Sequence, residues 1–134
     1  MVVPVLALVA WTLVIWVVMY TRRIPAMQAA RIDPQEAAMK GALDRLPAPA
    51  RQAADNYNHL HEQPTIFYAL SLAIAVAGIA DPLFVGLAWA YVASRVLHSI
   101  VQVTANRVVV RFAVFAAGSI ILMVMTGRAL MGLL

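Results

Sequence analysis

The sequence predicts an all-α integral membrane protein, built as a left-handed, up-down four-helix bundle. Of its 134 residues, 63% are hydrophobic and only 12% are charged, which leaves too little polar surface for a soluble domain of this size. The apolar residues gather in four long runs, separated by one long polar connection and two short ones. Helices joined in this way pack against their neighbours in sequence.

The basic residues do not form the stripe that nucleic-acid binding requires. The formal net charge is +4, but most arginines flank the apolar runs, as they do in membrane proteins. The chain contains no cysteine, so disulfides, thiolate metal sites and a protein thiol nucleophile are excluded. Any sulfur chemistry must come from a substrate.

The first membrane helix is expected at about residues 2–22. Residues 2–20 carry no charge and are numerous enough to span the hydrocarbon core. Arg22 and Arg23 follow this run, whereas a cleaved signal peptide carries its positive charge before the apolar core. We therefore expect this helix to be retained.

The connection over about residues 23–48 is expected outside the membrane, because it mixes acidic and basic residues with prolines. The run Asp33-Pro34-Gln35-Glu36 has the pattern of a helix start, which predicts a short helix to about Leu43. Three more membrane helices are expected at about residues 49–80, 82–104 and 107–133. Pro64 should kink the first of these three or mark its entry into the membrane.

The distribution of basic residues predicts the orientation. Six basic residues lie between residues 21 and 57, and Arg107 lies in the connection around Asn106, whereas the turn over residues 78–82 carries none. The positive-inside rule places both basic connections in the cytoplasm and both termini on the periplasmic side of a bacterial inner membrane. Arg128 is an exception, because it lies near the end of the fourth helix and would face the periplasmic side. Several small residues recur at helical spacing, which indicates close helix contacts or arises by chance in an alanine-rich chain. They are Ala69, Ala73, Ala77, Ala113, Ala117 and Gly118.

Polar residues are expected to converge in the cytoplasmic half of the bundle. Arg95, His98 and Gln102 have the spacing of one helical face, and Glu62 enters the membrane from the same side. Arginines facing a cleft can bind carboxylates and lower the pKa of a bound thiol, so a glutathione-like ligand would suit this set. The alternative is an Arg95–Glu62 ion pair that locks the bundle, with Arg107 and Arg111 as topology determinants.

The histidines predict no metal site. His59 and His61 are two residues apart, which does not place both on one helical face, and the sequence offers no evident third ligand. His98 is interpreted as a hydrogen-bonding wall in preference to a general base.

Three segments together resemble the MAPEG family, the membrane-associated proteins in eicosanoid and glutathione metabolism. The matching residues are Glu62-x-Pro64 with Phe67, Ala93-Ser94-Arg95-x-x-His98, and Asn106-Arg107-x-x-x-Arg111. The resemblance covers the whole chain. It implies a homotrimer that binds glutathione between neighbouring subunits near the cytoplasmic face, with lipophilic substrates arriving from the bilayer.

The resemblance also implies roles for single residues. Glu62 matches the family's glutathione-contacting glutamate, and Arg111 matches the arginine that stabilises the glutathione thiolate. The other matches are basic or aromatic positions near the ligand: Arg95, His98 and Arg107. The departures are Asp55 for an arginine, His59 for an asparagine and Gln102 for a tyrosine that touches glutathione.

Two functions from different classes stay open. The first is a glutathione-dependent transferase or peroxidase that acts on lipophilic electrophiles or lipid hydroperoxides, with glutathione as co-substrate. The second is a non-catalytic lipid-binding or scaffold protein of the same fold. The matches at Glu62, Arg95 and Arg111 favour the enzyme, and the departures at positions 55, 59 and 102 favour the second function or a different thiol. A small transporter is a third, weaker possibility, because no internal repeat is evident.

Overall fold

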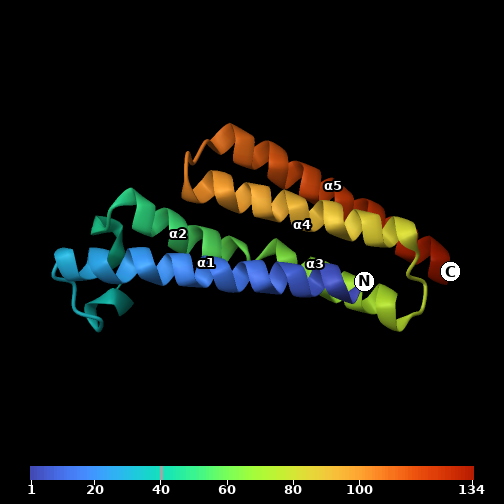
Figure 1. Cartoon of the computed structure of the whole chain (residues 1–134), viewed down its shortest axis with the longest axis horizontal. Coiled ribbons are helices and arrows are strands. Elements are labelled where there is room, and N and C mark those ends of the chain that lie inside the picture. Colours follow the sequence, from blue (N-terminus) through green and yellow to red (C-terminus); the bar gives the residue numbers. More distant parts are fainter. Residues whose placement is uncertain (40) are drawn as a thin grey trace.

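Four helical passes run along one long axis (Figure 1). The computed structural model describes residues 1–39 and 41–134, and these residues contain no strand. The α-helices are α1 (Val2–Ala29), α2 (Ala48–His59), α3 (Gln63–Val76), α4 (Pro82–Val103) and α5 (Val108–Leu133); two 3-10 helices, η1 (Glu36–Ala38) and η2 (Ala42–Arg45), lie in the first connection. Because α2 and α3 form one interrupted pass, the described chain is an up-down bundle of four passes, which confirms the predicted fold class.

Three helices, α1, α4 and α5, are long and apolar enough to cross a membrane. Helix α3 has only 14 residues, about 21 Å at 1.5 Å per residue, which is shorter than the hydrocarbon core of about 30 Å. The second pass therefore needs the end of α2 as well as α3 to cross the bilayer.

Helix α4 lies at the centre of the bundle. It contacts α1, α2 and α5. In its most apolar 18-residue stretch, 39% is buried, compared with 17% in the corresponding stretch of α5. The buried core runs between α4 and its neighbours and includes Leu8, Phe67, Ala88, Tyr91 and Met125. The outer faces of α1 and α5 expose large apolar side chains, which lipid tails can cover in a membrane.

The two ends of the bundle differ in charge. One end holds residues 30–39 and 41–47 together with the turn at residues 104–107, and we call it the basic end. There, Arg22 Nη1 donates to the Val103 carbonyl at 2.9 Å. The opposite end holds both termini (Figure 1) and the turn before Asp81. The Asp81 side chain accepts from the Phe84 N–H at 2.8 Å and pairs with Arg128. The hydrogen bond from the Phe84 N–H, and to a smaller extent the contact with Arg128, holds the pKa of Asp81 below its usual range.

The Asp81–Arg128 pair explains the one arginine that opposes the predicted orientation. The Arg128 guanidinium carbon also lies 5.1 Å from the centre of the Phe84 ring. The charge of Arg128 is thus met by a carboxylate and an aromatic ring of the same chain. It does not add unpaired positive charge to this end.

Two predicted helix boundaries at the basic end were wrong. Helix α1 continues to Ala29 because Ala26 and Met27 pack on a small second core of Ile32, Leu46 and Ala50. The apolar membrane span ends near residue 20, but the helix does not.

The predicted short helix up to Leu43 was also wrong, because the chain forms η1 and η2 in its place. Asp33 Oδ1 accepts from the Gln35 N–H at 2.7 Å, which makes a local turn. Gly41 then has a φ of +83°, a left-handed conformation that interrupts helical structure.

The predicted small-residue contacts divide into buried and exposed positions. Gly118 is buried, whereas Ala69, Ala73 and Ala77 are exposed on α3. A Cβ placed on Gly118 would lie 3.0 Å from Ser94 Oγ and 3.5 Å from the ring of Tyr91. Gly118 therefore permits close contact between α4 and α5.

Enlarging Gly118 should separate α4 from α5. We expect Gly118→Leu to lower the free energy of unfolding in detergent by about 1–3 kcal/mol through overpacking. Gly127→Leu on the same helix is the matched control, because a Cβ at Gly127 has no atom within 4 Å among the described residues. Equal losses in the two variants, measured by denaturant unfolding, would contradict a specific contact at Gly118.

Candidate functional site

The break between α2 and α3 positions the candidate site. Pro64 lies in the first turn of α3, where its missing N–H leaves no helical bond unmade. In one continuous helix, its ring would clash with the carbonyl of Leu60, four residues earlier. Helix α2 therefore ends at His59, and residues 60–62 redirect the chain. The predicted continuous helix over residues 49–80 is thus replaced by two helices.

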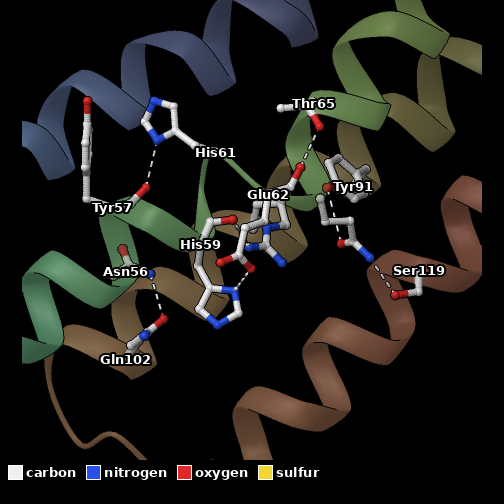
Figure 2. Close-up of polar contacts among 11 residues, drawn as sticks. Asn56, Tyr57, His59, His61, Glu62, Thr65, Tyr91, Gln102 and Ser119 are labelled. Carbon is white, nitrogen blue, oxygen red and sulfur yellow. Dashed lines mark hydrogen bonds and ion pairs between the residues drawn. The ribbon is translucent and has the colours of Figure 1, made fainter.

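At the break, side chains add hydrogen bonds to three carbonyls that each also accept from the backbone N–H three residues later. His61 Nδ1 lies 2.8 Å from the Tyr57 carbonyl, and Thr65 Oγ1 donates to the Glu62 carbonyl at 2.6 Å (Figure 2). Arg95 Nη2 reaches from α4 and donates to the His59 carbonyl at 3.3 Å. Because these backbone bonds are long, at 3.2–3.4 Å, the side-chain contacts help to stabilise the break. A guanidinium at the C-terminal end of α2 is also favoured by the helix dipole.

Arg95 is enclosed by protein, and only 1% of it is exposed. Its guanidinium carbon lies 5.8 Å from the centre of the Phe115 ring, and its Nε and Nη1 have no partner among the described residues. Glu62 Oε2 lies 3.3 Å from His59 Nδ1 (Figure 2). The alternative of an Arg95–Glu62 ion pair is therefore contradicted, because the ion pairs among the described residues join His59 to Glu62 and Arg128 to Asp81.

The polar residues predicted to share one face of α4 are all buried. His98 and Gln102 are 3% and 1% exposed. Gln102 Oε1 accepts from Asn56 Nδ2 at 2.9 Å, which joins α4 to α2 (Figure 2). The rings of His59 and His98 have their centres 5.5 Å apart. The α4 residues are therefore brought together with the end of α2, as the spacing indicated.

Two adjoining cavities open beside these residues. The polar cavity, of about 290 Å³, is lined by Asp55, Asn58, His59, Glu62, Gln102 and Arg111. The apolar cavity, of about 210 Å³, is lined by His59, His98, Val108, Arg111, Phe112 and Phe115. Because His59 and Arg111 line both, they form the boundary between a polar compartment and an apolar one.

Arg111 is held in place by the turn before α5. Its Nη1 donates to Asn106 Oδ1 at 2.7 Å, and Asn106 adopts a φ of +47°, which asparagine tolerates better than most residues. The Nε of Arg111 is buried and has no partner among the residues described, whereas the side chain as a whole lines both cavities. Arg107, one turn earlier, is exposed and lines neither the polar nor the apolar cavity.

These features place the matched motifs at one end of one helical bundle. A protein-family model described as the MAPEG family matches residues 1–131. The chain belongs to the MAPEG family. It is therefore a membrane protein of the glutathione and eicosanoid metabolism family, and the resemblance noted in the sequence is confirmed. No match was found among curated proteins or among solved structures.

Sequence reasoning missed two residues that line the candidate site, and it named Asn106 in the matched motif without the contact that Asn106 makes. Phe112 and Phe115 line the apolar cavity, and Asn106 orients Arg111. Phe115 could have been found, because it lies four residues after Arg111 and so on the same face of α5. The contribution of Asn106 had no such signal, since it depends on the shape of the turn.

Next to the candidate site, a chain of hydrogen bonds connects three helices of the MAPEG bundle. Tyr91 Oη donates to Gln63 Oε1 at 3.3 Å, and Gln63 Nε2 donates to Ser119 Oγ at 2.7 Å (Figure 2). These bonds connect α4, α3 and α5. They fix the start of α3, and with it the position of Glu62.

The histidines near the break have separate partners. His59 faces Glu62, whereas His61 turns to the carbonyl of Tyr57 (Figure 2). The described part of the chain has no group of three or more metal-ligating side chains that could hold an ion.

Proposed function

We propose that this MAPEG protein is a glutathione-dependent transferase or peroxidase that acts on lipophilic electrophiles or lipid hydroperoxides. The observation that carries the proposal is the position of Arg111 on the wall shared by the polar and apolar cavities. A small peptide thiol in the polar cavity and a lipophilic molecule in the apolar cavity would meet beside this guanidinium. Binding two reactants in adjacent compartments converts their encounter into a local step.

The polar cavity offers partners for each group of a peptide thiol. Glu62 can accept from the ligand's ammonium group, because its side chain is 63% exposed. The amide groups of Asn58 and Gln102 can bond the peptide units. Arg111 remains for the thiol. We therefore assign His59, Glu62 and Gln102 to thiol binding and Arg111 to catalysis.

The chemical contribution of the protein is mainly electrostatic. A guanidinium beside a bound thiol lowers its pKa by about one to three units, so more of it is thiolate at neutral pH. The bound thiolate supplies the nucleophile. Phe112 and Phe115 keep water from the apolar side of Arg111, which strengthens the interaction between the two charges.

The remaining predicted residues receive supporting roles. His98 forms a wall of the apolar cavity. Arg95 is a positioning residue, because it holds the His59 carbonyl and so the end of α2. Arg107 lies outside both cavities and serves as a positive topology determinant.

The predicted membrane arrangement belongs to the same proposal. The basic end would face the cytoplasm of a bacterial inner membrane, with both termini on the periplasmic side. The assembly would be a homotrimer, as the family resemblance implies, and lipids would surround the exposed faces of α1 and α5. The polar cavity would then open toward cytoplasmic thiols.

A non-catalytic lipid-binding or scaffold protein is the second candidate. It is favoured by the engagement of Gln102 with Asn56 and of Glu62 with His59, because these contacts reduce what the cavity offers a thiol. Such a protein would bind lipophilic ligands in the apolar cavity and would have no need of Arg111 to stabilise a thiolate.

Calorimetric titration of detergent-purified protein with glutathione tests the proposal. We expect binding at millimolar concentrations, weakened at least tenfold by Arg111→Ala and by Glu62→Gln, because each removes a charged partner of the ligand. Matched controls are Arg45→Ala and Glu36→Gln, which change exposed residues of the first connection and should leave binding intact. Absence of binding in folded parent protein would refute the proposal and favour the scaffold.

A further inference from the structure

We propose that His59 is the general base of the thiol reaction and that Glu62 orients it. The inference rests on the proposed thiol-dependent function and adds a proton acceptor to it. A thiol that binds beside Arg111 must lose its proton before the sulfur can attack an electrophile. The guanidinium favours the resulting thiolate, but it has no lone pair with which to take up the proton.

The contact between His59 and Glu62 determines which nitrogen of the imidazole is free. His59 Nδ1 is buried and lies 3.3 Å from Glu62 Oε2 (Figure 2). An ionised carboxylate only accepts hydrogen bonds, so the neutral imidazole carries its proton on Nδ1. The lone pair is then on Nε2, which points away from Glu62 (Figure 2). A histidine that a carboxylate orients in this way is arranged to accept a proton.

His59 also lies where the two reactants would meet. It lines both the polar and the apolar cavity, as Arg111 does, and its side chain is 34% exposed. A sulfur atom bound between the two cavities would therefore be next to the imidazole and the guanidinium together. These two residues and Glu62 belong to one chain. A neighbouring subunit of the proposed homotrimer can add walls to the cavities, but it does not supply these three groups.

The other groups around His59 are less suited to take the proton. Arg95 donates to the His59 carbonyl and has no lone pair. The ring centre of His98 lies 5.5 Å from that of His59, but His98 is only 3% exposed and does not line the polar cavity. Asp55 does line it, but a carboxylate is a weaker base than imidazole. Because imidazole exchanges protons near neutral pH, His59 is the best acceptor among the described residues of this cavity.

The proton transfer can be written for the addition of a thiol to an activated alkene. His59 Nε2 accepts the thiol proton as the S–H bond breaks, and the electron pair stays on the sulfur beside Arg111. Glu62 stabilises the imidazolium that forms. The sulfur then bonds to one alkene carbon while the π bond breaks, and His59 returns the proton to the other carbon. The product thus contains both the sulfur and the proton, and the imidazole is neutral again.

His59→Asn is the variant that tests this role. The amide nitrogen of asparagine takes the place of Nδ1 and can still donate to Glu62, whereas nothing replaces Nε2. We expect kcat for glutathione addition to a long-chain α,β-unsaturated ketone to fall about 10²-fold, while Kd for glutathione changes far less. His61→Asn is the matched control, because His61 lines neither cavity and its Nδ1 contacts the Tyr57 carbonyl. It should leave kcat near the parental value.

Proton release distinguishes a base from a merely structural histidine. At about pH 8, where free imidazole is mostly neutral, glutathione is mixed with the protein in weak buffer. The ultraviolet absorbance of the thiolate and an indicator dye follow thiolate formation and released protons together. The parent should form thiolate with almost no proton released, because His59 keeps the proton. His59→Asn should release about one proton for each thiolate, because the proton then passes to water.

The outcomes separate the two proposals. If the parent releases one proton for each thiolate, the general-base role is overturned while thiol binding stands, and this measurement needs no variant. If His59→Asn, shown to be folded by near-ultraviolet circular dichroism, keeps the parental kcat, the role is overturned equally. If the folded parent binds no glutathione, the proposed function fails and the inference fails with it.

Discussion

Replacing Arg111 with alanine is expected to lower kcat/KM for thiol addition to a lipophilic electrophile by about 10²-fold. The guanidinium lies on the wall shared by the two cavities, where the thiolate and the developing charge of the reaction would both be closest to it. Removing one preorganised charge partner at such a position costs about 10²–10³-fold in rate. Steady-state kinetics with a chromogenic electrophile would measure the loss.

The pH dependence gives the same prediction a second readout. Because the guanidinium favours the thiolate, the pKa of the bound thiol is lower in the parent than in Arg111→Ala. The rate should therefore reach its plateau at a pH about one to three units higher in the variant. A uniform loss of rate with an unchanged midpoint would show that Arg111 binds the thiol without activating it.

Arg107→Ala is the matched control for Arg111→Ala. Both arginines lie at the start of α5, but Arg107 is exposed and lines neither cavity. We expect its removal to change kcat/KM by less than about threefold, the effect of a distant and screened charge. Equal losses in the two variants would indicate a general electrostatic field and would remove the special role of Arg111.

The number and order of the membrane passes could be predicted because they depend on hydrophobicity alone. The first helix and the turn before Pro82 follow from where apolar runs begin and end. The start of α2 at Ala48 follows from Pro47 and Pro49. Where a helix extends beyond its apolar run, its end is set by the contacts that it buries. The extension of α1 beyond Arg23 depends on Ala26 and Met27 finding Ile32, a contact that local sequence does not reveal.

The break in the second pass was only partly predictable. Pro64 indicated a kink, but the position of the break at residues 60–62 depends on partners that lie elsewhere in the chain. Arg95 supplies one of them by donating to the His59 carbonyl. The sequence pattern suggested Glu62 as the partner of Arg95 because opposite charges attract, yet the unpaired end of α2 attracts the guanidinium too.

The candidate site was predictable where helical spacing fixes direction. The spacing of Arg95, His98 and Gln102 placed them on one side of α4, and all three are buried on the side facing α2. Spacing does not reveal depth, so it predicted that Arg95 and Arg107 contact the ligand together with Arg111. Only the folded chain separates an enclosed, an exposed and a cavity-lining arginine.

Phe67→Ala is expected to cause a large loss of stability, about 3 kcal/mol in the free energy of unfolding. Phe67 is fully buried, and its ring stacks on that of Tyr91 with centres 4.6 Å apart. Because lipid tails are as apolar as the protein core, burial itself drives little of this packing. The cost comes from the contacts that the cavity removes, and from disturbance of the bond between Tyr91 and Gln63.

Phe112→Ala separates stability from function. Phe112 is 71% exposed, so its removal should change the free energy of unfolding by less than about 0.5 kcal/mol. It lines the apolar cavity, so KM for the lipophilic substrate should rise by a larger factor than Kd for the thiol. For Phe67→Ala we expect the reverse result. Denaturant unfolding should show a lower free energy of unfolding, whereas titration of the folded fraction should show unchanged ligand binding. A loss of stability in Phe112→Ala as large as that in Phe67→Ala would contradict the assignment of Phe67 to the buried core and of Phe112 to the surface.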